Sequence, residues 1–231
     1  MLRGKNCLIT GATGGIGSCI AKRMAEEGCN LFLTSTNKEK LKSLRGELQH
    51  LIDYMSCDLN SVEAIEFLIE FLKDYWSIDI LINCTGVYII NPLEELSLED
   101  YETTMNVNMR AAFLFSKAFV PGMVEQKWGR IVNIASVAAY NGYRNNSIYC
   151  ASKHALLGFS RALHEELREH NIRVFCISPG ATKTPMGGKI NREDANTFIK
   201  PEEIADYIAQ IISFDSTMIS EEVRLNRMVI P

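Results

Sequence analysis

A tyrosine and a lysine four residues apart, Tyr149 and Lys153, form the pair with the clearest chemical potential in this chain. On a helix, residues four apart share one face, so the lysine ammonium can lie beside the tyrosine hydroxyl. A neighbouring positive charge favours the ionised hydroxyl and lowers its pKa from the usual value of about 10. Such a tyrosine can act as an acid or base. The spacing alone also fits two unrelated residues on a solvated helix face.

Two further polar residues precede this pair. Ser136 lies thirteen residues before Tyr149, just after the apolar run Arg130–Ile134. Asn108 lies in an otherwise apolar helical stretch, where its side chain competes with backbone hydrogen bonds, and a local kink explains it equally well. Reduction of a carbonyl needs an acid and a hydrogen bond that orients the oxygen. Tyr149 and Ser136 have the side chains for these two tasks.

The segment from residue 11 to residue 17 can bind phosphate groups. It follows the apolar run Asn6–Thr10 and precedes a helical pattern, and it consists of Gly11, Ala12, Thr13, Gly14, Gly15, Ile16 and Gly17. Glycines let a pyrophosphate approach backbone N–H groups and the positive end of a helix. Glycine-rich turns also simply join elements, but the strand before this segment and the helix after it favour a dinucleotide site.

The elements that must position these residues alternate between two patterns. Short, almost continuously apolar runs are typical of parallel strands covered on both faces, and they are Asn6–Thr10, Asn30–Ser35, Asp79–Asn83, Arg130–Ile134 and Arg173–Ser178. Apolar residues at three- and four-residue spacing indicate helices over Ser18–Glu27, Lys38–His50, Ser61–Asp74, Ser97–Gln126 and Ile148–His170. The alternation predicts an α/β fold with one doubly wound parallel sheet. Such sheets bind ligands at the carboxyl ends of their strands.

The glycine spacing and the order of Asn108, Ser136, Tyr149 and Lys153 resemble the short-chain dehydrogenase/reductase family. The resemblance implies an oxidoreductase with a single-domain Rossmann fold over residues 1–231, its doubly wound sheet flanked by helices on both faces. It also implies the roles of the four residues. Tyr149 is the expected acid/base, and Ser136 orients the carbonyl. Lys153 binds the nicotinamide ribose and lowers the tyrosine pKa, while Asn108 holds a proton-relay water.

The resemblance further implies the cofactor and its contacts. The second strand ends in Ser35, Thr36 and Asn37, with Lys38 next and no carboxylate to repel a phosphate, so we expect NADP(H) in preference to NAD(H). The other expected contacts are Asp58 and Leu59 after the third strand, Asn83 and Gly86 after the fourth, Tyr149 and Lys153, and Pro179, Gly180, Thr182 and Thr184 beside the nicotinamide. Local turn chemistry is a second interpretation of Asp58. The two residues between Asn83 and Gly86 depart from the family pattern.

Composition excludes several other classes. The 231 residues are 47% hydrophobic, as in one compact domain, and the net charge of −4 leaves no broad basic face for nucleic acid or an anionic membrane. No apolar run approaches the roughly 20 residues of a membrane span, and the N-terminus lacks a signal-peptide pattern, so we expect a cytoplasmic protein. Seven scattered cysteines and four histidines show no metal-binding spacing, so we expect no metal.

Within the family, the chain is most similar to 3-oxoacyl-acyl-carrier-protein reductases of fatty acid biosynthesis. This implies a carbonyl substrate, either a small molecule or bound to an acyl carrier, and a homodimer or homotetramer. The tail differs, with a helix from Pro201 and a short strand from Val223 that lacks a glycine pair. Such tails favour a small hydroxy acid, sugar or other alcohol as the alternative substrate. We expect residues 185–200 to form a mobile substrate lid. A non-catalytic cofactor-binding regulatory protein is a further alternative, which the complete set of four residues disfavours.

Overall fold

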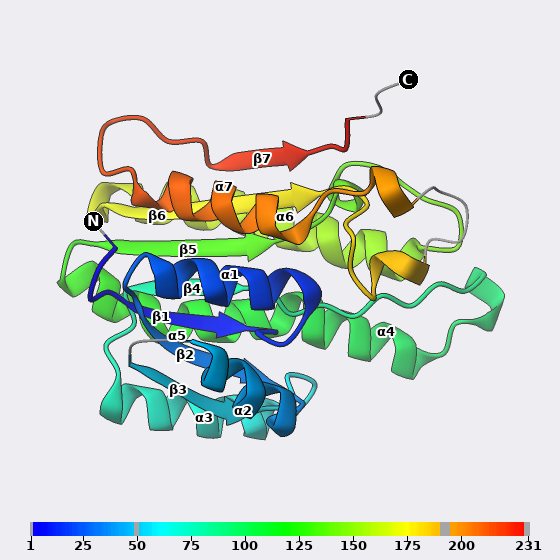
Figure 1. The fold of residues 1–231 in the computed structure, drawn as a ribbon. Helices are drawn as coiled ribbons and strands as arrows, with labels where there is room; N and C mark the ends of the chain where they lie inside the picture. The colour runs from blue at the N-terminus through cyan, green and yellow to red at the C-terminus, as the bar shows by residue number, and fades with distance from the viewer. Residues whose placement is uncertain (1, 49–50, 190–194, 229–231) are drawn as a thin grey trace.

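The computed structural model describes residues 2–48, 51–189 and 195–228, and these form one seven-stranded parallel sheet (Figure 1). The strand order is β3-β2-β1-β4-β5-β6-β7. The strands are β1 (Asn6–Thr10), β2 (Asn30–Ser35), β3 (Ile52–Ser56), β4 (Ile80–Asn83), β5 (Gly129–Ile134), β6 (Ile172–Pro179) and β7 (Glu222–Leu225). The predicted doubly wound α/β fold is therefore confirmed.

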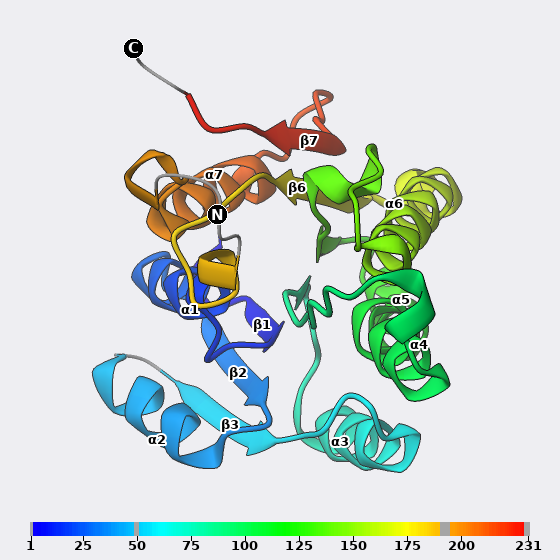
Figure 2. The ribbon, with the colours of Figure 1, turned by 90° about the vertical axis from the view of Figure 1, so that its right-hand side faces the viewer.

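Helices cover both faces of this sheet (Figure 2). One face carries α1 (Gly15–Glu26), α2 (Lys38–Glu47) and α7 (Pro201–Ser213), and the other carries α3 (Val62–Tyr75), α4 (Leu98–Met105), α5 (Ala111–Glu125) and α6 (Ser147–Leu167). Each strand alternates its apolar side chains between two cores. Ile9 and Ile82 pack with α1 and α7, while Leu8 and Leu81 pack with α3 and α5. This explains why the strands are apolar on both faces.

The strand order reverses between β1 and β4. From β1 the chain builds outward through β2 and β3, and it then crosses over to place β4 on the other side of β1, with Thr10 opposite Asn83. The loops after these two strands therefore diverge to opposite faces of the sheet. Such a switch point opens a crevice at the carboxyl ends of the strands. The glycine segment begins at this crevice.

Three elements differ from the sequence predictions. Strand β3 is absent from the apolar runs because Asp53 and Ser56 face solvent, as one-sided exposure allows at a sheet edge. The expected helix over Ser97–Gln126 is divided into α4 and α5 by a π-helical turn, Asn106–Arg110. The expected helix over Lys38–His50 ends at Glu47, because the next residue, Leu48, has an extended backbone. Residues 49 and 50 of that prediction lie outside the described residues. The tail helix and strand occur as predicted, as α7 and β7.

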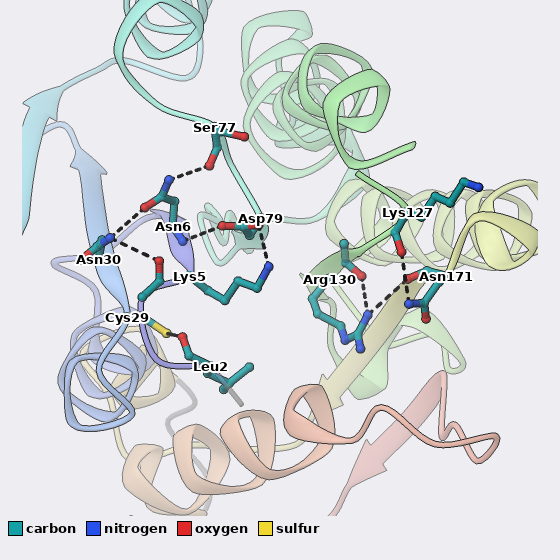
Figure 3. A network of polar contacts seen from close by, with 12 residues as sticks. Leu2, Lys5, Asn6, Cys29, Asn30, Ser77, Asp79, Lys127, Arg130 and Asn171 are labelled. Carbon is teal, nitrogen blue, oxygen red and sulfur yellow. Dashed lines mark hydrogen bonds and ion pairs between the residues drawn. The ribbon is translucent and has the colours of Figure 1, made fainter. Parts of the chain in front are cut away.

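A buried arginine, Arg130, bonds to the backbone of Asn171 just before β6 (Figure 3). Arg130, near the start of β5, is fully buried, and its guanidinium packs 4.3 Å from the centre of the Trp128 ring. It donates to Oδ1 of Asp215 at 2.8 Å and to the carbonyls of Gly129, Asn171, Ile212 and Phe214. Burial lowers the pKa of Arg130 to about 10. Because its acceptors come from three segments, this side chain locks the end of α7 onto β5.

Two other features bear on the classes considered above. Within the described ranges, no helix combines the length and apolar character needed to cross a membrane. In the same ranges, no three His, Cys, Asp or Glu residues gather into a group that could hold a metal ion. All seven cysteines are free thiols.

Candidate active site

A cavity of about 1650 Å³ runs along the carboxyl ends of the strands. Its lining joins the glycine segment to Ser136, Tyr149 and Lys153, which are far apart in the sequence. Of the predicted site residues, the lining includes Gly11, Thr13, Gly14, Gly15, Ile16, Gly17, Ser35, Thr36, Asp58, Leu59, Gly86, Ser136, Tyr149, Lys153, Pro179, Gly180, Thr182 and Thr184. The lining does not include four other predicted site residues, whose positions are described below: Ala12, Asn37, Asn83 and Asn108.

The glycine segment forms a cradle that side chains would fill. Gly11 has a φ of +64°, and a Cβ there would lie 2.8 Å from the Cα of Thr85. A Cβ on Gly17 would lie 2.2 Å from the carbonyl oxygen of Gly11. Gly14 precedes α1 and provides no side-chain cap, so the first N–H groups of that helix face the cavity. Ala12 is buried and donates its N–H to Thr34. The cradle therefore fits a pyrophosphate at a helix N-terminus.

The end of β2 lies beside this cradle. Thr13 Oγ1 donates to Ser35 Oγ at 2.8 Å, and the Asn37 side chain caps α2 by accepting from Lys40 N–H at 2.9 Å. Asn37 therefore shapes the turn and does not line the cavity. The lysine that lines the cavity beside the end of β2 is Lys40, whereas Lys38 is not part of the lining. Sequence reasoning missed Lys40, although its position in the first turn of a capped helix was a usable signal.

Two predicted contacts after β3 and β4 have different placements. Asp58 lines the cavity, and its Oδ1 also accepts from Asn60 N–H at 2.9 Å, so the interpretation as local turn chemistry is confirmed and the cofactor contact stays a prediction. Asn83 is buried below the cavity, where its Nδ2 donates to Asn133 Oδ1 at 2.8 Å, and Asn133 donates to Ser160 at 2.9 Å. This polar chain joins β4, β5 and α6. Asn83 therefore supports the cavity floor from beneath.

Tyr149 and Ser136 both line the cavity, and their side chains interact by a hydrogen bond. Ser136 lies just after β5 and begins a short 3-10 turn, with its Oγ accepting from Ala138 N–H at 3.1 Å. Burial raises the pKa of Tyr149 to about 12, and the Ser136 hydroxyl acts against that shift by a hydrogen bond. Tyr149 is therefore a protonated hydroxyl at neutral pH, suited to donating a proton.

Lys153 is buried beside Tyr149. Its Nζ donates to the carbonyl of Ile134 at 3.0 Å and lies 5.8 Å from the centre of the Tyr149 ring. Burial lowers the pKa of Lys153 to about 8, and burial is also the largest cause of the raised pKa of Tyr149. Burial therefore opposes the expected lowering of the tyrosine pKa, and the effect of Lys153 on that pKa stays a prediction. Most Lys153 side chains still carry a proton at pH 7.

Asn108 organises the site through its amide. It lies in the π-helical turn between α4 and α5, a type of distortion often found at functional sites. Its Nδ2 donates to the carbonyl of Val87 at 3.1 Å and to Ser152 Oγ at 3.0 Å, and its Oδ1 accepts from Val87 N–H at 2.8 Å. Ser152 in turn donates to the carbonyl of Tyr149. Asn108 therefore joins the loop after β4 to the catalytic helix, and its relay water stays a prediction.

The loop after β6 packs against the glycine cradle. A Cβ on Gly15 would lie 2.4 Å from Thr184 Cγ2, so only glycine allows this close approach. The expected lid over residues 185–200 is described except for 190–194. Its two ends are anchored, because Ile199 N–H donates to the carbonyl of Ala181 at 3.0 Å and Gly187 N–H donates to Thr184 Oγ1 at 3.1 Å. Whether the segment moves as a lid stays a prediction.

Sequence reasoning also missed one side of the cavity. Tyr88 follows Gly86 by two residues, and its ring centre lies 4.6 Å from that of Tyr149. The loop between Ser136 and α6 adds Tyr143, Arg144 and Asn146 to the lining. Their only sequence signal is their position between Ser136 and Tyr149. Tyr143 and Asn146 lie close enough to Tyr88 to act on the pKa of its hydroxyl.

A parallel doubly wound sheet with a phosphate cradle and a half-buried tyrosine in one cavity at the carboxyl ends of its strands is typical of dinucleotide-dependent oxidoreductases. Residues 5–195 match the short chain dehydrogenase family, and the chain belongs to that family.

Its relatives share most of their length with it. The 3-oxoacyl-acyl-carrier-protein reductase of Thermotoga maritima is 33% identical over 235 residues, covering 96% of each chain. Among solved structures, a metagenomic short-chain oxidoreductase in complex with NADP is 29% identical, with a TM-score of 0.86 over 99% of each chain. The 3-ketoacyl-acyl-carrier-protein reductase of Brucella melitensis complexed with NADH is 26% identical, with a TM-score of 0.89 over 98% of this chain and 97% of that one. Bound cofactors of both kinds therefore occur among similar folds.

Proposed function

We propose that this oxidoreductase is an NADP(H)-dependent reductase of the 3-oxoacyl-acyl-carrier-protein type. One observation carries the proposal, namely that Ser136, Tyr149 and Lys153 line the same cavity as the glycine cradle. The similarity to 3-oxoacyl-acyl-carrier-protein reductases over 96% of the chain supports this substrate class. Turnover tests it directly: NADPH oxidation is measured with 3-oxoacyl thioesters, diketones and aldehydes, and NADP⁺ reduction is measured with hydroxy acids. Activity with thioesters above the rest is expected.

The reaction divides between the cofactor and the side chains. When bound, the nicotinamide supplies a hydride to the carbonyl carbon. Tyr149 donates its hydroxyl proton to the carbonyl oxygen, which Ser136 holds in place by a hydrogen bond. Lys153 holds the nicotinamide ribose by its ammonium, and Asn108 positions the loop and helix on either side of them. The buried setting keeps competing water away from the reacting atoms.

The proposal extends to the location, the partners and the oligomeric state of the enzyme. We propose a cytoplasmic protein that takes a carbonyl substrate as a small molecule or on an acyl carrier and has no nucleic acid or membrane partner. A homodimer or homotetramer would cover the exposed apolar side chains of α4 and α5, which include Leu98, Tyr101 and Phe113. The competing proposals lead to different results with this panel of substrates. A hydroxy-acid enzyme oxidises those substrates with NADP⁺, whereas a regulatory protein binds cofactor and converts nothing.

Carbonyl reduction is expected to lose its rate as the pH rises through about 8. The pKa of Lys153 is lowered to about 8 by burial, so its ammonium is lost above that pH, while Tyr149 with a pKa of about 12 stays protonated. The pH profile of kcat/KM reports groups of the free enzyme. It is expected to be level below pH 8 and to fall about tenfold per unit above it. Lys153→Arg keeps its charge and should remove this limb; a limb that stays in place would contradict the assignment.

The cofactor preference is expected to depend on Lys40. Ser35, Thr36 and Lys40 line the cavity at the end of β2, so a 2′-phosphate there meets two hydroxyls and an ammonium. Lys40→Ala is expected to weaken NADPH binding by about tenfold, the size of one charge-assisted contact, and to leave NADH binding unchanged. Fluorescence titration with both cofactors measures this. The exposed Lys117 on α5 provides the matched control, Lys117→Ala. Tighter binding of NADH than NADPH by the unaltered protein would refute the preference.

A further inference from the structure

The charges around the cavity are strongly one-sided. Among the described residues that line it, Lys40, Arg144, Lys153 and Arg227 are basic and only Asp58 is acidic. The chain as a whole carries a net charge of −4, so this concentration of positive charge is local. A cleft lined by one sign of charge raises the local concentration of ligands of the opposite sign. The cofactor phosphates explain charge near the cradle, but Arg144 comes from a different part of the lining, the loop that leads into α6 five residues before Tyr149.

Arg144 differs from the other basic residues in the contacts that its side chain makes. Lys153 is buried and donates to Ile134, and Arg227 donates to Thr197 Oγ1 at 3.1 Å. Lys40 lies at the end of β2 beside the cradle. The Arg144 guanidinium is exposed and makes no hydrogen bond or ion pair with the residues that the structure describes. A guanidinium has five donors in a planar fork and no acceptor, so it matches carboxylate or phosphate oxygens.

The backbone that carries Arg144 is held on both sides. Its carbonyl accepts from Asn146 Nδ2 at 2.7 Å, and Asn146 N–H donates to the carbonyl of Tyr143 at 3.2 Å. Asn145 adopts a left-handed conformation with a φ of +63°, and its carbonyl accepts from Asn91 N–H at 3.1 Å. These bonds tie the loop to α6 and to the segment after β4. The loop is therefore a defined support that holds the backbone of Arg144 at the entrance to α6.

Asn146 adds a second polar group to this part of the lining. Its side chain is 7% exposed and lines the cavity, and its Oδ1 has no hydrogen-bond partner among the described residues. A buried polar atom without a partner is costly, and a ligand is one way to satisfy it. Arg144 donates and Asn146 can accept, so the pair suits a ligand with both an anionic group and a hydroxyl or amide.

We infer that Arg144 binds an anionic group of the substrate, so that the substrate class is a carbonyl compound bearing a carboxylate or phosphate. This inference rests on the proposed carbonyl reductase activity. Two sources supply the same chemistry: the carboxylate of a short oxo acid and the phosphate of a pantetheine arm on an acyl carrier. An anion held here would orient the substrate with its carbonyl toward Tyr149 and Ser136.

The test compares charged and neutral probes on the full chain. Calorimetry measures binding of 3-oxobutanoate, pantetheine 4′-phosphate and the neutral methyl 3-oxobutanoate to the protein saturated with NADP⁺. NADPH oxidation is followed with 3-oxobutanoate, its methyl ester and a 3-oxobutanoyl pantetheine 4′-phosphate thioester. Arg144→Gln is expected to weaken binding of at least one anion by about tenfold or more and to raise its KM, with ester binding unchanged. Arg144→Lys should restore part of the affinity, and added salt should weaken it.

A matched control removes the same charge elsewhere. Arg168 pairs with Glu165 just beyond the end of α6, which by its 21 residues is about 30 Å long, so Arg168→Gln should leave every probe unaffected. Thermal melting of each variant monitors folding. Stronger loss for 3-oxobutanoate identifies the carboxylate source, and stronger loss for the phosphate identifies the pantetheine arm.

The outcomes separate this inference from the activity it rests on. If the unaltered protein binds neither anion more tightly than the ester, or if Arg144→Gln binds all three probes normally, the inference is wrong, whatever is reduced. If the anion binds through Arg144 but no carbonyl compound is turned over, the proposed function fails and the anion site stands.

Discussion

Replacing Tyr149 with phenylalanine is expected to reduce turnover by between about 10² and 10⁴-fold, the usual contribution of a positioned acid. The change removes one oxygen and keeps the ring, which packs 4.6 Å from the ring of Tyr88. Cofactor binding should stay within about twofold, because the glycine cradle and Lys40 are untouched and one lost contact outside them costs little. Single-turnover NADPH oxidation measures the chemical step, and fluorescence titration measures cofactor binding.

The control for this change is Tyr75→Phe on α3, where the hydroxyl belongs to a side chain that is 72% exposed. It should leave both measurements unchanged. Retention of full turnover by Tyr149→Phe would show that another group donates the proton. Loss of cofactor binding together with turnover would mean that the phenol maintains the cavity and is not only an acid.

The second large effect concerns the cradle. Gly17→Ala would place a Cβ 2.2 Å from the carbonyl oxygen of Gly11 and 3.1 Å from the Cα of Ala12. Both neighbours are backbone atoms, so the loop must move to relieve the contact. NADPH affinity is expected to fall by at least about 100-fold, or ~2.7 kcal/mol, and the overpacked loop should lower stability by about 1–3 kcal/mol. Titration and denaturant unfolding measure the two effects.

Gly122→Ala is the matched control for that experiment. Gly122 lies within α5, and a Cβ there meets no atom within 4 Å. Alanine in a helix is favoured over glycine by about 0.5–1 kcal/mol, so this variant should bind NADPH normally and unfold at slightly higher denaturant. Normal NADPH affinity in Gly17→Ala would show that the cradle tolerates a side chain, against the close approach that the glycines provide.

The fold was predictable where the pattern follows from burial. Strands covered on both faces, such as β1 and β4, are apolar throughout, and their alternation with amphipathic helices leads to the doubly wound sheet. Strand β3 was not predicted from an apolar run because it is an edge strand, in which Asp53 and Ser56 are exposed. The π-helical turn around Asn108 was not predicted as such, because its extra residue leaves the spacing of apolar residues along the helix almost intact.

The site was predictable where a residue type is demanded by the backbone or by chemistry. The glycines and the order of Ser136, Tyr149 and Lys153 belong to this kind. Lys40 was missed because sequence distance from the end of the strand ignores the direction of a side chain on a helix. Arg144 lies in an irregular loop, where no period reveals which side chains face a cavity. The rise of the Tyr149 pKa by burial was not predicted, because residue spacing does not report burial.

The hydrogen bonds of Arg130 affect how well this fold tolerates substitutions elsewhere. They secure the amino ends of the strands and the close of α7, whereas every reacting group lies at the carboxyl ends. Substitutions that retune the substrate pocket therefore fall on loops that contribute little to the anchoring of the sheet. Selection for a new substrate can then proceed through several successive changes before the folded state is endangered, which makes this chain a favourable starting point for directed evolution.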